Sequence, residues 1–433
     1  ELYHELEERH LSCREFRITD TMPLFCGLVA FKYFYNYYQF AFPMIAGLCS
    51  IVYTVITLCL FMLFLPVTLL TVHGSTKSRV SLFLPALLIP LAVILNISYV
   101  IIQTGNLGIL SRSYILTAAF GTNDEKGYYF SQLNTWFGNM TVVLLLYKYI
   151  QSRKQIAHCI CACILVMIVP VVAIILQNPG YLGTRSSTFD NSDVVFGGGL
   201  WNIGVVYFGS LFWLSQLVYP CATKKQKRMI RFATVFFPAI GIAGLSRTLI
   251  MMISISMAYF FIISRKTVDL VKKTFLVIAL VLLIMVLESN IVTMLLERFT
   301  DSTSGGNNIR ILLWKAYGRH IGEYWLLGAP EGSVYRYYRD INRYGAYFLP
   351  HSALLNFLIR FGVVGCLAYV ELIIKSFGIT EKVPRDEKVY LISACLSYIA
   401  LAFINQTGYA EPIFYIMFGL LLGCRRMRGE GRC

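Results

Sequence analysis

The chain has 433 residues, 57% of them hydrophobic and only 14% charged, with a formal net charge of +15. Soluble domains carry about 25% charged residues, so this composition excludes an ordinary soluble protein. Most Lys and Arg residues lie between long apolar runs, where they set membrane orientation, so we expect no nucleic-acid partner. Unbroken apolar runs long enough to cross a lipid bilayer predict an all-α polytopic membrane protein and exclude a barrel of alternating strands.

The predicted elements begin with a polar segment at 1–20, which we place in the cytoplasm. The next stretch, 24–42, is rich in Tyr and Phe and carries Lys32, so it either crosses the membrane or lies in its interface. Clear spans are predicted at 45–72, 80–102, 130–150, 156–176, 194–219, 229–244, 247–264, 270–295, 353–376, 388–404 and 411–424. With the first stretch counted, twelve transmembrane helices are predicted.

The basic residues between the spans agree with the positive-inside rule. With the N-terminus inside, the inner loops and the cytoplasmic tail at 425–433 are rich in Lys and Arg. The chain then divides into nine spans within 21–295, a large loop on the outer side at 296–352, and three spans within 353–424. This loop is the exception, because seven Lys or Arg fall between 298 and 343. Either long loops follow the rule loosely, or the loop offers an anion-binding surface.

Three residues near this loop are candidates for binding and catalysis. Arg247 lies at the predicted outer end of a span, where an arginine either snorkels to the headgroups or is functional. Arg310 opens a predicted amphipathic helix, IRILLWKAYGRHIGEYWLL, where its guanidinium either is solvated or takes phosphate in bidentate fashion. His351 directly precedes Ser352, a candidate N-cap, and either is an interfacial residue or serves as a general base.

Motifs of other protein classes are missing from the sequence. It contains no GxxxxGK[ST] motif of ATPases and no GxSxG motif of hydrolases. No cluster of His and carboxylates suggests a metal, so we expect that any transfer chemistry proceeds without a metal ion or other cofactor. Cys159, Cys161 and Cys163 resemble a metal cluster only superficially, because residues two apart on a helix point to different faces. We predict that they are buried thiols.

Four short motifs occur in a recognisable order. They are LSRTLIM with Arg247, NIRILLWKA with Arg310, the glycine-rich LLGAPEG, and PHSALLNFLIRFGVVG with His351. Their order, spacing and common side of the membrane resemble the O-antigen polymerase and O-antigen ligase superfamily. The resemblance covers roughly 240–370 and agrees with the count of twelve spans.

The resemblance implies a GT-C-like glycosyltransferase of the bacterial inner membrane that uses glycans carried on undecaprenyl diphosphate at the periplasmic face. It implies that Arg247 and Arg310 hold the donor diphosphate and that His351 takes the proton of the acceptor hydroxyl. Further phosphate or glycan contacts are expected from Arg319, Arg336, Arg339, Arg343 and Trp314. Aromatic residues such as Trp314 suit sugar stacking and the headgroup region equally.

Three functions are considered for this sequence. A polymerase extends the lipid-linked glycan, with a flippase and a chain-length regulator as partners, whereas a ligase moves the glycan onto lipid A–core. The segment between Arg310 and His351 is shorter than expected of a ligase, which favours the polymerase. A transporter or flippase is the alternative from another class, but it predicts many ionisable residues near the middle of spans. Few are found here, and the candidates are Lys32, Arg360 and Glu371.

Overall fold

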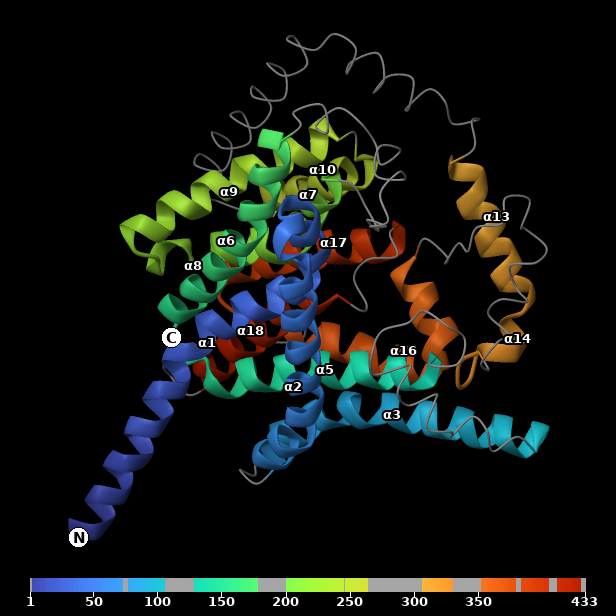
Figure 1. Ribbon diagram of the computed structural model, residues 1–433, viewed down its shortest axis with the longest axis horizontal. Coiled ribbons are helices and arrows are strands. Elements are labelled where there is room, and N and C mark those ends of the chain that lie inside the picture. Colours follow the sequence, from blue (N-terminus) through green and yellow to red (C-terminus); the bar gives the residue numbers. More distant parts are fainter. Residues whose placement is uncertain are drawn as a thin grey trace.

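The computed structural model describes residues 2–72, 77–105, 128–177, 200–244, 246–263, 306–329, 352–378, 383–404 and 411–429. These residues form helices joined by short connections, and no strand occurs among them. Most of the helices run side by side in one bundle (Figure 1). The all-α class that the composition predicts is therefore confirmed.

Apart from α1, the helices of the first part of the chain follow the predicted spans to within a few residues. They are α1 (Leu2–Ala41), α2 (Ala46–Val72), α3 (Lys77–Thr104), α5 (Tyr128–Tyr149) and α6 (Arg153–Gln177). α1 joins the predicted polar segment and the first predicted span in one continuous helix. It extends away from the bundle towards its N-terminal end (Figure 1).

The helices of the second part include those that carry the candidate residues. They are α7 (Trp201–Tyr207), α8 (Trp213–Val218), α9 (Lys224–Ala243), α10 (Arg247–Ile263), α13 (Gly306–Arg319), α14 (Ile321–Tyr324), α16 (Ala353–Phe377), α17 (Arg385–Ile404) and α18 (Pro412–Gly429). A π-helical turn at Phe208–Phe212 joins α7 to α8. The predicted amphipathic helix of the long loop corresponds to α13 and α14, which are separated at His320. The predicted span at 270–295 lies outside the described residues.

Membrane-crossing helices are found by length and composition. Among the described residues, four helical stretches are long and apolar enough to span a bilayer: Pro43–Leu70, Arg153–Gln177, Asn202–Cys221 and Ala353–Phe377. Leu87–Gln103 and Thr248–Ile263 are shorter apolar helices. These helices support an integral membrane protein, while the count of twelve spans and the GT-C-like arrangement stay predictions.

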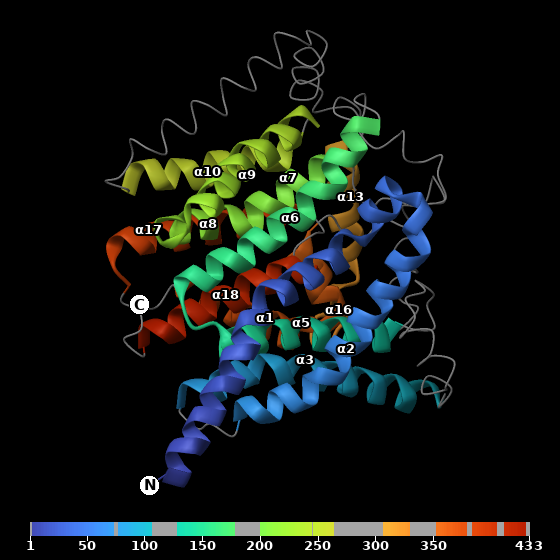
Figure 2. The same ribbon diagram turned by 60° about the vertical axis from the view of Figure 1, so that its left-hand side comes forward.

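The bundle is held together by helices that are far apart in the sequence. α1 packs on α6, α5 on α18, α3 on α16, and α10 on α17, as the two ribbon views show (Figures 1 and 2). The three alternating cysteines lie in α6, and all are buried. The thiol of Cys163 contacts the carbonyl of Cys26 in α1 at 3.6 Å. As predicted, these side chains are buried thiols that pack between helices.

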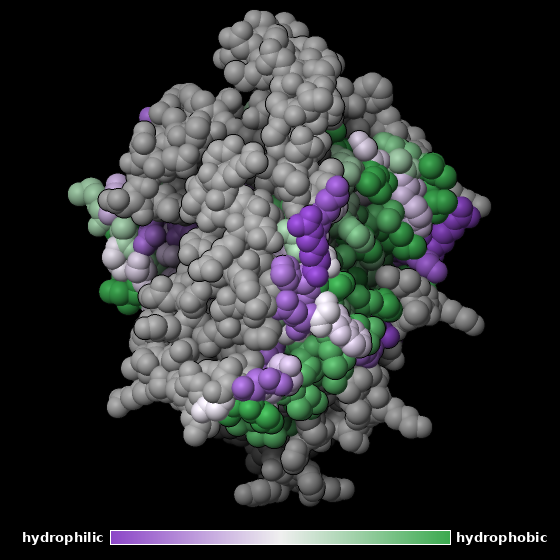
Figure 3. All heavy atoms as spheres, turned by 90° about the vertical axis from the view of Figure 1, so that its right-hand side faces the viewer, coloured by the Kyte–Doolittle hydropathy of each residue, from purple (hydrophilic) through white to green (hydrophobic). Residues whose placement is uncertain are grey.

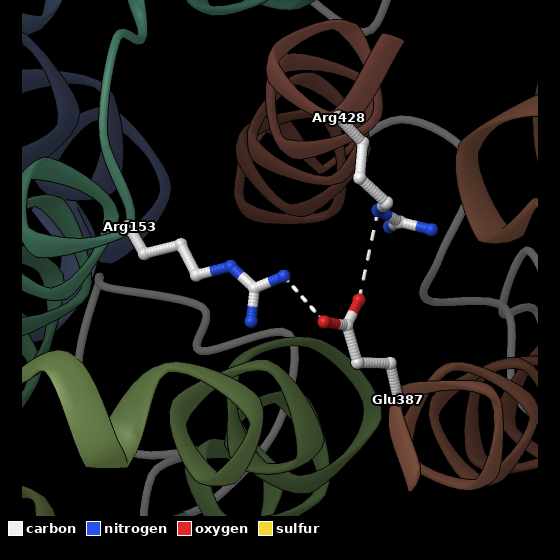
Figure 4. Close-up of polar contacts among 3 residues, drawn as sticks. All are labelled: Arg153, Glu387 and Arg428. Atoms are coloured by element: carbon white, nitrogen blue, oxygen red, sulfur yellow. Dashed lines mark hydrogen bonds and ion pairs between the residues drawn. The ribbon is translucent and has the colours of Figure 1, made fainter. Parts of the chain in front are cut away.

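A charged cluster joins three helix ends at one side of the bundle. Arg153 at the start of α6 and Arg428 near the end of α18 both face Glu387 near the start of α17 (Figure 4). At the same side, Arg426 donates to the carbonyl of Ile150, after the end of α5, at 2.6 Å. The charge pattern of the sequence assigns all of these ends to the cytoplasm. Ends that are predicted to share one side of the membrane therefore meet in the structure.

Candidate functional site

The start of α16 is fixed by a hydrogen-bonded cap. The Ser352 hydroxyl accepts a hydrogen bond from the backbone N–H of Leu355 at 3.4 Å and donates to the carbonyl of Ala402, near the end of α17, at 3.5 Å. The predicted N-cap is therefore confirmed, and it also joins α16 to α17. Because His351 is the preceding residue, its position in the chain directly adjoins this junction, although His351 itself lies outside the described residues.

The start of α10 points to the same end of the bundle. Phe260 in α10 and Tyr390 in α17 have ring centroids 5.3 Å apart. Met252, which comes earlier in α10, and Leu401, which comes later in α17, lie beside the same residue of the π-helical turn, Gly209. α10 and α17 therefore run antiparallel, which brings Arg247, the first residue of α10, towards the end of α17. That end is the one joined to the start of α16.

α13 packs across the first turns of α16. Leu313, Tyr317 and Tyr324 form one buried cluster with Ile359 of α16. Trp314, on another face of α13, is 40% exposed, so the helix is amphipathic as predicted. α13 runs crosswise to α3 and α5 (Figure 1), as expected of a helix lying along a membrane surface. Figure 3 shows this side of the molecule, where hydrophilic residues form a narrow band beside a hydrophobic area.

A buried phenol stiffens the connection between α13 and α14. The Tyr324 hydroxyl donates to the carbonyl of Tyr317 at 2.7 Å, and the Tyr324 side chain is 1% exposed. Burial raises the pKa of Tyr324 to about 12, because the charged phenolate loses its water. The phenol therefore stays a neutral donor at physiological pH, and it ties the last turn of α13 to α14.

α16 is broken at Gly362, and the break receives the turn that follows α14. Gly362 has φ 64° and ψ −169°, a combination that is essentially limited to glycine. The opened backbone donates from Val363 N–H to the carbonyl of Trp325 at 2.6 Å. It also accepts at the Ile359 carbonyl from Ala329 N–H, again at 2.6 Å. Gly362 is therefore the point at which α16 bends and receives the LLGA turn at 326–329.

A residue that the sequence did not single out completes this junction. Asn96 of α3 is 2% exposed, and its side-chain amide points at three successive carbonyls of the same turn. Nδ2 lies 3.2 Å from the oxygen of Leu327, 2.9 Å from that of Gly328 and 3.3 Å from that of Ala329. The only signal for Asn96 in the sequence is an amide within an apolar run, and nothing there indicates which backbone it meets.

The structure describes some of the predicted site residues and not others. The backbones of Arg247 and Arg310 lie in α10 and α13, while their side chains are outside the described part of the structure. Arg319, at the end of α13, is exposed like Trp314. The remaining predicted residues, which lie outside the described residues, are Arg336, Arg339, Arg343 and His351. Within the described residues, no group of three or more His, Cys, Asp or Glu is placed to hold a metal ion.

Comparison with known proteins identifies one family. A sequence model of the family described as O-antigen ligase matches residues 232–370. No curated protein and no solved structure matches the chain. The matched stretch runs from within α9 to within α16 and includes the starts of α10, α13 and α16. The resemblance stated from the four sequence motifs is therefore confirmed, while the roles of the individual residues stay predictions.

Proposed function

We propose that this chain, whose residues 232–370 match the family described as O-antigen ligase, polymerises oligosaccharide repeat units carried on undecaprenyl diphosphate. The superfamily consists of glycosyltransferase-like enzymes, which favours an enzyme over a transporter. The observation that carries the proposal is the meeting of helix ends: α16 is capped against the end of α17, α10 begins towards that end, and α13 packs on α16.

In the proposed reaction, a hydroxyl of the acceptor glycan attacks the anomeric carbon of the lipid-linked donor. A carbon–oxygen bond forms there, and the bond from this carbon to the diphosphate oxygen breaks. His351 takes the hydroxyl proton, and undecaprenyl diphosphate leaves with the bonding electrons. Arg247 and Arg310 offset the negative charge that grows on the leaving diphosphate.

The placement of the two arginines supports these roles. Arg247 is the first residue of α10, and Arg310 lies in the first half of α13. Anions are stabilised at helix N-termini by the helix dipole and by backbone N–H groups that have no partner within the helix. The proposed reaction requires no metal ion, because guanidinium groups supply the positive charge that a metal would otherwise bring.

Ligase activity is the second candidate, and the match to the family described as O-antigen ligase supports it equally. The two activities share the donor and the leaving group and differ in the acceptor. A polymerase uses the next lipid-linked repeat unit, whereas a ligase uses lipid A–core.

The test is the banding of lipopolysaccharide from a strain that lacks the gene, with and without a plasmid copy of the full chain. A core that carries a single repeat unit in the deletion strain means polymerase. A bare core with polymer left on the lipid carrier means ligase. Unchanged banding would refute both activities.

We further propose that the protein lies in the bacterial inner membrane with this site at the periplasmic face, beside a flippase and a chain-length regulator. Gly318 of α13 offers a test of sidedness, because a side chain at this position would meet nothing within 4 Å. Gly318→Cys should react in intact spheroplasts with a maleimide that does not cross membranes, above the background of the unmodified chain. Reaction only after lysis would place α13 in the cytoplasm and overturn the assignment.

A further inference from the structure

The turn between α14 and α16 has backbone polar groups that must find partners in an apolar environment. A helix end leaves its last carbonyls without partners inside the helix, and unsatisfied groups are costly where water is excluded. In the turn at 325–329, the Trp325 carbonyl and the Ala329 N–H bind the opened backbone of α16. Three further carbonyls of the turn, at 327, 328 and 329, face the amide of Asn96.

One side chain from a distant helix therefore satisfies three backbone groups. A carboxamide has two N–H groups, so at least one of them is shared between two of these carbonyls. No hydroxyl of Ser or Thr at this position would provide two donors, and a carboxylate would provide none. Asn96 lies in α3, which packs on α16, so the turn is held between two helices of the bundle.

Glycine at two positions makes this close approach possible. A Cβ at Gly328, where φ is 94°, would lie 2.3 Å from the carbonyl oxygen of Arg360. A Cβ at Gly362 would lie 2.1 Å from the carbonyl oxygen of Leu326. The backbone of the turn packs directly against the backbone of α16 at its kink. The Asn96 side chain, from α3, binds the carbonyls of the turn. Such a junction has little freedom to shift without losing several hydrogen bonds at once.

We propose that Asn96 is a positioning residue: its amide fixes the turn at 325–329, and through this turn it holds α13, with Arg310, against the start of α16. The inference rests on the proposed function, because Arg310 is assigned there to the donor diphosphate. Asn96 acts through the backbone of the turn and is not assigned any contact with substrate.

Two measurements on the full chain in lipid nanodiscs test the role. The first is amide hydrogen exchange at Ala329 and Val363, whose N–H groups bind across the junction. The second is the KM and kcat of glycan transfer from an undecaprenyl-diphosphate-linked repeat unit. The variants are Asn96→Asp, which has nearly the same shape and no donor, and Asn96→Ser, which is smaller and uncharged.

Thr57→Val is the matched control. Thr57 is a buried polar residue of α2 whose hydroxyl donates to the carbonyl of Tyr53, one turn earlier in the same helix, at 2.9 Å. This variant removes a buried hydroxyl from a membrane helix without touching the turn. It should leave exchange at the junction and the KM for the donor unchanged.

Both Asn96 variants should speed exchange at Ala329 and Val363 at least about tenfold and raise the KM for the lipid-linked donor about tenfold, since small displacements of binding groups have large kinetic effects. A loss of folded protein alone would lower the maximal rate and leave KM unchanged. Exchange at the wild-type rate in the folded variants would overturn the proposal, as would faster exchange with an unchanged KM. If the wild-type chain transfers no glycan, the proposed function fails, and the exchange data alone decide whether Asn96 fixes the turn.

Discussion

Replacing Gly362 by Ala should disrupt the candidate site more than any other single methyl group added to α16. The new Cβ would lie 2.1 Å from the Leu326 carbonyl oxygen and 2.5 Å from the Leu327 backbone nitrogen. Both are backbone atoms, so no side-chain rotation relieves the overlap, and the turn must move away. The residue would also have to keep φ 64° and ψ −169°, a conformation that costs about 1–3 kcal/mol for a residue with a Cβ.

The displacement of the turn adds to this cost. Two hydrogen bonds cross the junction, from Val363 to Trp325 and from Ala329 to Ile359. Each contributes about 0.5–1.5 kcal/mol, so loss of both with the backbone strain gives a total of about 2–6 kcal/mol. A penalty of this size favours a straightened α16 with the turn detached, which would carry α13 away from the start of α16.

The assay compares Gly362→Ala with Gly318→Ala in the same detergent or nanodisc. Alanine at 318 meets open space and improves helix propensity by up to about 1 kcal/mol. Gly362→Ala should lower the unfolding temperature and reduce glycan transfer at least about a hundredfold, while Gly318→Ala should retain both. Wild-type stability and activity in Gly362→Ala would show that the kink does not position α13, and the structural reasoning would be refuted.

Further expectations concern the proposed chemistry and the inner charged cluster. His351→Ala should abolish transfer while expression and thermal unfolding stay normal; wild-type polymer levels would remove His351 from the mechanism. Arg247→Lys and Arg310→Lys should each lower glycan transfer strongly in a complementation assay, because the point charge of Lys does not replace the bidentate guanidinium. Full activity in both variants would mean that these positions need only a positive charge or have only a structural role. Glu387→Gln should destabilise the fold by about 1–3 kcal/mol, between the values for exposed and fully buried pairs, because Arg153 and Arg428 share this carboxylate; an unchanged unfolding temperature would show that the cluster contributes nothing.

The positions of most described helices could be predicted because membrane spans are local features. An apolar run of sufficient length predicts a helix wherever it occurs, and α2, α3, α5 and α6 lie close to the predicted ranges. The Ser352 cap was also predictable, since a cap bonds to a residue only three positions away. The amphipathic character of α13 followed from the spacing of its apolar residues for the same reason.

The sequence by itself also determined which helix ends share a side, because the distribution of Lys and Arg is read during insertion, before the helices pack. The cluster of Arg153, Glu387 and Arg428 agrees with that assignment. The sequence alone did not determine which acidic residue Arg153 and Arg428 would share, because such a pairing depends on which helices are neighbours in the bundle.

Only the tertiary structure decided how the candidate site is built. Asn96 and the carbonyl of Gly328 are 232 positions apart in the chain, and no local pattern links them. The kink at Gly362 likewise depends on the turn that fills it, because the same residues without that partner would continue as a regular helix. The local pattern of apolar residues determines where helices form. Hydrogen bonds between the backbones and side chains of helices far apart in the sequence determine where α16 leaves helical geometry and how the candidate site is held in place.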